Sequence, residues 1–234
     1  MARLRIRAAF AKQDAAKFIG HLDLTKVFER AMRRAELPMA FSEGFNPHPK
    51  MSFGSALALG ATSVREYVDI DLAEEMPPQE FGTRLTEQLP PGIALLEVKE
   101  IPMYTKALMA VLNCTCYQIK VPLLLPLTQA KFTEVLQRFV GQDSIPYVRY
   151  AKNKGRQDKD LKPYLRKLSG QVSAEWLELE LEVVLGNQGS VKPVEVVAVL
   201  REFGDLPLDV DGIRVHRNGI FICDGQGMKS PMDL

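Results

Sequence analysis

Hydrophobic residues alternate between a two-residue and a 3.6-residue period along this chain, and the order of these stretches restricts the folds that it can adopt. A two-residue period is typical of a half-buried strand, and a 3.6-residue period of an amphipathic helix. In the first half the patterns follow the order β-α-β-β-α-β of a ferredoxin-like unit with an antiparallel sheet. The expected strands lie at 3–10, 51–59, 65–72 and 93–101, and the expected helices at 20–35 and 77–89.

The second half repeats this order without recognisable sequence identity to the first. We therefore predict an α+β fold of two tandem ferredoxin-like (βαββαβ) units with antiparallel sheets, over residues 1–104 and 105–234, and a basic insertion at 149–168 in the second. A chain of 234 residues with 46% hydrophobic residues can form two such domains. The expected strands of the second half lie at 111–121, 145–150 and 174–185, with a hairpin over 213–223, and the expected helices at 128–140 and 190–203.

Several classes of protein are excluded by composition and spacing. No run of 18 or more apolar residues occurs, and a strand pattern begins almost at the N-terminus, so we predict a cytoplasmic protein with no membrane span and no signal peptide. The cysteines Cys114, Cys116 and Cys223 have neither zinc-site nor iron–sulfur spacing. We therefore expect no metal and no cofactor in this chain.

Positive charge is concentrated in two stretches, although the net charge is only +1. Residues 1–50 contain ten Lys and Arg against five Asp and Glu, and residues 149–167 contain eight against two. The stretch 51–106 between them is acidic, with four against nine. This segregation favours a polyanionic partner such as RNA.

The first strand carries part of the first basic block. Arg3, Arg5 and Arg7 alternate with apolar residues and are expected on the open face of the strand. In the predicted topology this strand lies beside 65–72, so Asp69 and Asp71 would share that face. The arginines therefore form either a ligand-binding surface or a ladder of cross-strand ion pairs.

The first helix carries a second group of cations. Its apolar residues fall on one stripe, and its basic residues fall on a second stripe that faces solvent. An ordinary solvated helix face is one interpretation, and an anion-binding patch is the other. The candidate RNA-binding residues here are Lys26, Arg30, Arg33 and Arg34, together with Lys50 in the loop that follows.

That loop is rich in residues with restricted or unusual backbone geometry. Pro47 and Pro49 stiffen the chain on either side of His48, so this imidazole is expected to be held in place. His48 and His21, at the start of the first helix, are the only candidate catalytic residues. A partner-docking role is the alternative for the loop, with these candidate residues: Ser42, Gly44, Phe45, Asn46, Pro47, His48 and Pro49.

The insertion at 149–168 places tyrosines among cations. Cations that contact phosphates, combined with aromatic rings on which bases stack, are typical of single-stranded nucleic-acid binding. A solvated loop is the alternative interpretation. The candidate RNA-binding residues are Tyr150, Lys152, Lys154, Arg156, Lys159, Lys162 and Tyr164.

Several short motifs resemble a known family. The segments 18–24 (FIGHLDL), 42–49 (SEGFNPHP) and 66–69 (EYVD) are similar to those of the radical-SAM-linked proteins, a bacterial domain of unknown function, and the similarity continues to 230–232. Gly20 stands where this family more usually has serine. The resemblance implies a partner that is a radical S-adenosylmethionine (SAM) enzyme, encoded beside such a protein or fused to it. The tandem layout is also similar to that of CRISPR RNA-processing endonucleases, which use a histidine near the first helix.

Three functions follow as hypotheses. The first is a non-catalytic accessory protein that binds an RNA, such as tRNA or rRNA, and presents it to the radical SAM enzyme for modification. The second is a metal-independent RNA endonuclease in which His21 and His48 converge on one phosphate. The third is a protein–protein adaptor that docks the partner enzyme through Phe45.

Overall fold

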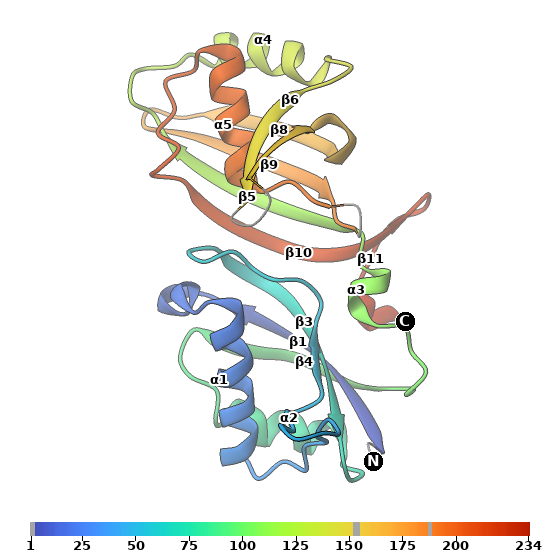
Figure 1. Ribbon diagram of the computed structural model, residues 1–234. Helices are drawn as coiled ribbons and strands as arrows, with labels where there is room; N and C mark the ends of the chain where they lie inside the picture. Colours follow the sequence, from blue (N-terminus) through green and yellow to red (C-terminus); the bar gives the residue numbers. More distant parts are fainter. Residues whose placement is uncertain (1–2, 152–154, 187–188) are drawn as a thin grey trace. The chain divides into compact units, whose positions relative to one another are not determined.

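The computed structural model describes residues 3–151, 155–186 and 189–234. The chain divides into two compact units, one made of Met1–Asn113 with Arg217–Leu234 and the other of Cys114–His216 (Figure 1). We expected a division near residue 104, but the first unit extends to residue 113 and includes the C-terminal segment. In the described part of the chain, no helix is both long and apolar enough to cross a membrane.

The first unit is built on an antiparallel sheet with helices on one face. Strand β1 lies between β3 and β4, and the short β2 pairs with β3. Only 51–53 of the expected strand 51–59 is extended and paired. The elements are β1 (Leu4–Lys12), α1 (His21–Arg34), β2 (Met51–Phe53), β3 (Thr62–Leu72), α2 (Pro78–Thr86), β4 (Ile93–Ile101), α3 (Leu108–Val111), β10 (Arg214–Asp224, assigned to this unit from Arg217), β11 (Gly227–Lys229) and the 3₁₀ helices η1 (Asp14–Phe18) and η3 (Pro231–Asp233).

The core of the first unit lies between this sheet and the two helices α1 and α2 (Figure 1). Leu24, Phe28 and Met32 recur at helical spacing on α1 and are buried against Ile6 and Ile70 of the sheet. The apolar stripe that was expected on this helix is therefore the face that packs. Its basic stripe remains toward solvent.

The second unit contains sheet strands in the order β5-β9-β8, with α4 and α5 packed on one face (Figure 1). A hairpin, β6–β7, forms a two-stranded sheet of its own. The elements are β5 (Cys114–Pro122), α4 (Gln129–Val140), β6 (Pro146–Ala151), β7 (Gly155–Asp160), the 3₁₀ helix η2 (Lys162–Tyr164), β8 (Leu165–Val172), β9 (Trp176–Val184) and α5 (Pro193–Gly204).

The prediction for 145–168 was wrong in one respect. The strand expected at 145–150 does not join the β5-β9-β8 sheet, because it pairs with 155–160 instead. Its place beside β9 is taken by β8, which begins inside the segment that we expected to be an insertion. The chain is a mixed α+β protein, and its pairs β1–β3, β1–β4, β5–β9 and β8–β9 are antiparallel.

Candidate nucleic-acid interface

The arginines of β1 form the cross-strand ladder. Arg5 lies opposite Asp71 and Arg7 opposite Asp69, and both pairs are bidentate. The hydrogen bonds to Asp71 raise the pKa of Arg5. Arg7 has no exposed surface, and its remaining donor bonds to the carbonyl of Pro231 at 2.9 Å.

This burial removes Arg7 from the predicted RNA-binding surface. The face of β1 that we expected to be open is covered, because residues 230–234 lie against it. Tyr67 bonds to Ser230 at 3.2 Å, and the ammonium of Lys99 donates to the carbonyls of Met232 and Leu234. Of the three arginines, Arg3 alone is exposed.

The cations of α1 divide into two groups. Arg34 donates to the side-chain and backbone oxygens of Gln88, so it joins α1 to the segment after α2. Lys26 and Arg33 form exposed ion pairs with Asp23 and Glu29 within the helix. Exposed ion pairs contribute little free energy, so these two cations can exchange their partners for a phosphate. The structure describes no hydrogen bond or ion pair of the Arg30 side chain, which is exposed. All four predicted cations are exposed, and Arg34 is the one that is bonded to another element.

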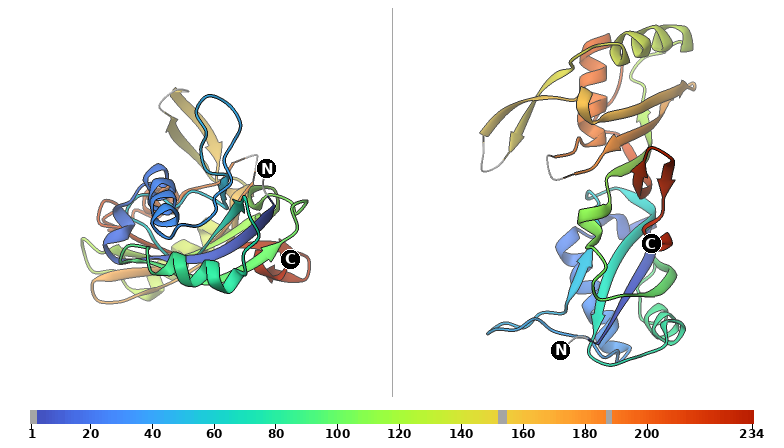
Figure 2. Two further views of the ribbon diagram at one scale, coloured as in Figure 1. Left: turned by 90° about the horizontal axis from the view of Figure 1, so that it is seen from below. Right: turned by 90° about the vertical axis from the view of Figure 1, so that its right-hand side faces the viewer.

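Residues 39–50 form a hairpin-like loop that projects from the first unit (Figure 2). Its two sides pair at Phe41 and Pro49, and its base bonds to the backbone of Asp71. The guanidinium of Arg33 lies 5.9 Å from the ring centre of Phe41, which joins the loop to the end of α1. Residues 43–48 at the end of the loop are exposed.

The two candidate catalytic histidines contact different elements. The His48 ring bonds through Nδ1 to Ser42 Oγ at 3.1 Å, so it is held in the loop as expected. His21 packs edge-to-face on Phe53, with ring centres 5.5 Å apart. The two rings therefore have different neighbours, Phe53 for His21 and Ser42 for His48. Their convergence on one phosphate stays a prediction.

In the second unit, the hairpin β6–β7 projects away from the β5-β9-β8 sheet (Figure 2). Tyr150 lies directly opposite Arg156 in its register, and both side chains are exposed, Tyr150 to 79%. Arg156 makes an exposed ion pair with Asp158 at 3.0 Å. Lys152 and Lys154, which lie between the two strands in sequence, fall outside the described residues. The hairpin thus presents an aromatic ring and a cation side by side.

Partly buried contacts hold the base of this hairpin. Arg149 forms a bidentate ion pair with Glu195 of α5, which raises the pKa of Arg149, and it also donates to the carbonyl of Ser190. Tyr147 is buried on the same side of the hairpin, and this burial raises its pKa. Asp160 Oδ1 accepts from the backbone N–H groups of Ile145 and Lys162, at 2.7 and 2.9 Å.

Three other candidates in this segment take supporting positions. The ammonium of Lys162 donates to the carbonyl of Val140 at 2.5 Å, so it caps the last turn of α4. Tyr164 is partly buried against the core of the second unit. Lys159 is partly buried opposite Tyr147. The exposed ring and cation predicted for an RNA contact are therefore Tyr150 and Arg156.

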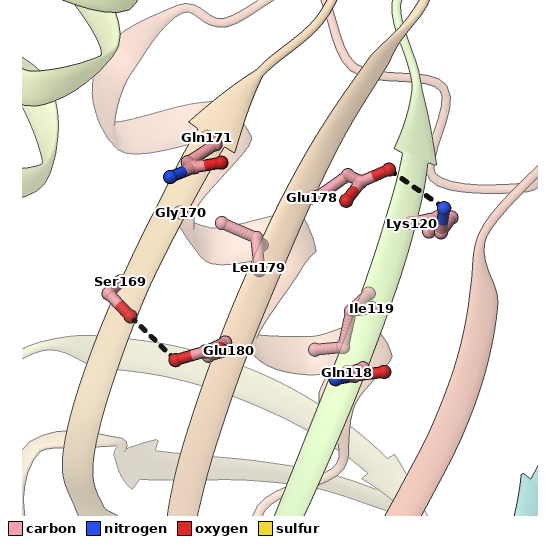
Figure 3. Close-up of a pocket in the computed structure, with 9 residues that line it drawn as sticks. All are labelled: Gln118, Ile119, Lys120, Ser169, Gly170, Gln171, Glu178, Leu179 and Glu180. Carbon is pink, nitrogen blue, oxygen red and sulfur yellow. Dashed lines mark hydrogen bonds and ion pairs between the residues drawn. The ribbon is translucent and has the colours of Figure 1, made fainter.

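The outer face of the β5-β9-β8 sheet has a polar depression of about 400 Å³ (Figure 3). Glu178 pairs with Lys120 at 2.7 Å, and Glu180 is 3.5 Å from Ser169. The row of glutamates along β9 repels phosphate. This face is therefore a poor candidate for RNA binding and a useful control surface.

Sequence reasoning missed a buried charged cluster in the first unit. Glu66 and Arg217 form a bidentate ion pair, and Arg217 also donates to the carbonyl of Ala56. Lys12 is buried beside them, and this burial lowers its pKa against the attraction of Glu66. Glu66 falls on the same strand face as Val68 and Ile70, and a carboxylate in that position was the signal for a buried cation.

No group of three or more His, Cys, Asp or Glu that could hold a metal ion occurs among residues 3–151, 155–186 and 189–234. The chemistry that the described surfaces can provide is recognition of an anion and of a planar apolar group. Neighbouring guanidinium and ammonium groups can bind the anion, and an exposed aromatic ring can stack on the planar group.

The fold and these surfaces define a mixed α+β protein with basic, aromatic hairpins. The chain belongs to a family described as an uncharacterized protein conserved in bacteria (DUF2344), whose model matches residues 5–193. That match does not test the linkage to radical SAM enzymes. No curated protein matches the chain.

Solved structures show only distant similarity. A chain in the crystal structure of a Cbf5-Nop10-Gar1 complex has 8% identity and a TM-score of 0.48, over 90% of this chain and 47% of that one. A chain in the structure of an H/ACA RNP bound to a substrate RNA containing 2'-deoxyuridine has 8% identity and a TM-score of 0.38, over 90% and 52%.

An unknown protein from Galdieria sulphuraria has 9% identity and a TM-score of 0.26, over 93% of this chain and 98% of that one. This chain spans about half the length of the first two chains that it matches. Similarity with TM-scores this low carries no argument about function.

Proposed function

We propose that this protein binds single-stranded RNA through the hairpin β6–β7 and presents it to a partner enzyme. The observation that carries the proposal is the exposed Tyr150 directly opposite the exposed Arg156. A base can stack on the phenol ring while the guanidinium contacts an adjacent phosphate. Lys152 and Lys154 add positive charge to the same stretch of sequence.

The anchoring of the hairpin supports this assignment. The bidentate pair between Arg149 and Glu195 and the two bonds to Asp160 hold the base of the hairpin. A ring that is presented from a fixed base loses little conformational entropy when it binds. The ordered base and the exposed side chains of Tyr150 and Arg156 therefore favour recognition over a merely solvated loop.

The partner and the finer fold are also part of the proposal. The resemblance of FIGHLDL and SEGFNPHP to radical-SAM-linked proteins supports a radical SAM enzyme as the partner. The pairings β4-β1-β3 and β5-β9-β8, each with helices on one face, support ferredoxin-like units, with β6–β7 inserted in the second. The different contacts of His21, with Phe53, and of His48, with Ser42, favour an accessory protein over an endonuclease.

The first test measures binding of a labelled 20-nucleotide single-stranded RNA by fluorescence anisotropy. Tyr150→Ala is expected to weaken binding about tenfold, because stacking of one base is worth about 1–3 kcal/mol. Arg156→Ala is expected to weaken binding and to reduce its dependence on salt, because one phosphate contact is lost.

Two control variants match these changes. Tyr104→Ala removes another exposed tyrosine, and Lys120→Ala removes a cation from the glutamate-rich sheet face. Both are expected to bind like the unaltered protein. Absence of RNA binding by the unaltered protein, or equal loss in the controls, would overturn the proposal. A denaturing gel checks that the RNA stays intact, and shortened RNA would instead indicate a nuclease.

A further inference from the structure

The 39–50 loop of the first unit has a fixed base. Ala40 donates to the carbonyl of Asp71, Asp71 to that of Lys50, and Lys50 to that of Ala40, at 2.8 to 3.0 Å. Phe41 and Pro49 then pair as a β-bridge. The backbone of the loop is therefore continuous with the hydrogen bonding of β3, and the loop extends from the sheet as a closed hairpin.

The tip of this loop is also ordered by its own contacts. Ser42 N–H donates to the carbonyl of His48 at 2.9 Å, and His48 N–H donates to Ser42 Oγ at 3.1 Å. Gly44 has φ of +116°, a conformation that side-chain-bearing residues rarely adopt. Phe45 follows directly at the apex. This sequence of contacts turns the chain tightly and directs it outward at Phe45.

Phe45 is fully exposed, with a relative accessibility of 106%. A large ring in this state buries nothing in its own fold, so its replacement removes no intramolecular packing. Because the loop that carries it is closed at Ser42 and His48, a partner that stacks on the ring has little backbone to order. The ring is therefore available as a binding element.

The charges near the loop indicate what kind of partner fits the ring. Arg33 lies against Phe41, Lys50 is exposed at the base of the loop, and Arg30 is exposed on the preceding turn of α1. Glu43 is the one acidic residue between 41 and 50. A ring beside cations matches a partner that has a planar group next to an anionic group. A nucleotide has both, in its base and its phosphate.

We propose that the 39–50 loop is a second RNA contact, at which an unpaired nucleobase stacks on Phe45 while Arg30, Arg33 and Lys50 face the adjoining phosphates. This inference rests on the proposed function and adds to it a second site, in the first unit, that holds an unpaired base. A base within a duplex is stacked on both sides and cannot receive the ring. The loop thereby selects single strands, bulges or loops.

The test uses the fluorescence of a tryptophan placed at position 45. The chain contains one tryptophan, Trp176, so Phe45→Trp in a Trp176→Phe background gives a signal from the loop alone. Addition of the 20-nucleotide single strand is expected to quench this fluorescence, and the same sequence in a perfect duplex is not. Equal quenching by both, or by neither, would overturn the inference.

Affinity measurements complete the test. Phe45→Ala is expected to weaken single-strand binding about tenfold, Phe45→Leu is expected to weaken it similarly because leucine lacks a planar ring, and Phe45→Trp is expected to retain it. Phe18→Ala is the matched control, since Phe18 is another exposed phenylalanine of the first unit. The melting temperature of the Phe45 variants is expected to stay unchanged.

The outcomes separate this inference from the proposed function. If Tyr150→Ala weakens binding and Phe45→Ala does not, RNA binding stands and the second contact is rejected. If the unaltered protein binds no RNA, both are rejected. If Phe45→Ala leaves RNA affinity unchanged but abolishes capture of the radical SAM enzyme, the loop is a protein-docking element and the inference is wrong.

Discussion

Arginine has three different roles in this protein, and its surroundings determine which role applies. Arg7 is buried and fully bonded, Arg149 anchors a hairpin to α5, and Arg156 is exposed beside a tyrosine. All three lie in stretches that are basic in sequence. A guanidinium that is already bonded to a carboxylate in the interior cannot bind RNA, whereas one on an exposed strand can.

The contribution of Asp160 can be tested at this scale. Asp160→Ala removes the acceptor for two backbone N–H groups at the base of the hairpin, and is expected to destabilise the protein by about 1–2 kcal/mol. Asp160→Asn keeps an oxygen acceptor and is expected to cost less. Urea denaturation followed by circular dichroism gives both values, and equal stability of all three proteins would contradict the assignment.

The same residue predicts a dependence on pH. The backbone hydrogen bonds, first that of Ile145, lower the pKa of Asp160 in the folded state. Its stabilisation is therefore complete above the ordinary aspartate pKa of about 3.9 and is lost as the pH falls through the lower folded value. The stability difference between the unaltered protein and Asp160→Asn should shrink over that range and stay constant above it.

Among the elements, β8 departs furthest from what its sequence pattern indicated. The pairing of β8 with β9 shifts register between Leu165 and Lys167, so the alternation of its side chains is interrupted there. Position 170 of β8 requires glycine, because a Cβ would lie 2.7 Å from the carbonyl oxygen of Glu178 and 2.6 Å from the Leu179 side chain. A strand with a bulge and a central glycine has no clear two-residue period.

The ion pairs between β1 and β3 give a prediction about this strand pair. Asp69→Ala is expected to destabilise the protein by about 3–5 kcal/mol, because it leaves Arg7 charged and unpaired in the interior. The double variant Arg7→Met, Asp69→Leu is expected to recover much of this loss. Thermal and urea denaturation measure both.

Two observations would contradict this interpretation of the ladder. Lys120→Ala breaks an exposed ion pair with the same shortest N···O distance, 2.7 Å, and is expected to cost less than about 1 kcal/mol. A loss of stability this small in Asp69→Ala would contradict the expected cost of leaving Arg7 unpaired in the interior. The Arg7 double variant is also expected to bind RNA normally when it is folded, and a specific loss of RNA affinity would return Arg7 to the binding surface.

At the scale of the whole molecule, the first unit depends on the end of the chain. Arg217 pairs with Glu66, and residues 230–234 bond to Arg7, Tyr67 and Lys99. These partners are separated by 130 residues or more in sequence. The sequence of the second unit lies between the two segments that form the first unit, so the first unit is complete only when residues 217–234 are present.

Truncation tests this dependence. A chain that ends at His216 leaves Glu66 without Arg217, and its first unit is expected to become sensitive to limited proteolysis while peptides from 114–216 persist. A chain that ends at Asp224 keeps Arg217 and is expected to show an intermediate sensitivity. Equal resistance of both truncated chains and the full chain would contradict this.

The sequence by itself determined the local elements and the chemistry that they offer. Periodicity placed α1, α4 and most strands, and the clustering of charge and tyrosine pointed to the segment that contains Tyr150 and Arg156. Such features depend on neighbouring residues, so they can be read from a short stretch of chain.

The tertiary structure alone decided which of these residues remain accessible. It covered Arg7 with residues 230–234, paired β6 with β7 rather than with the sheet of the second unit, and held His21 and His48 against different elements. Each of these outcomes depends on contacts between residues that are distant in sequence or on the competition of two strands for one partner. The hydrophobic period of a single segment records neither its long-range contacts nor which strand it pairs with.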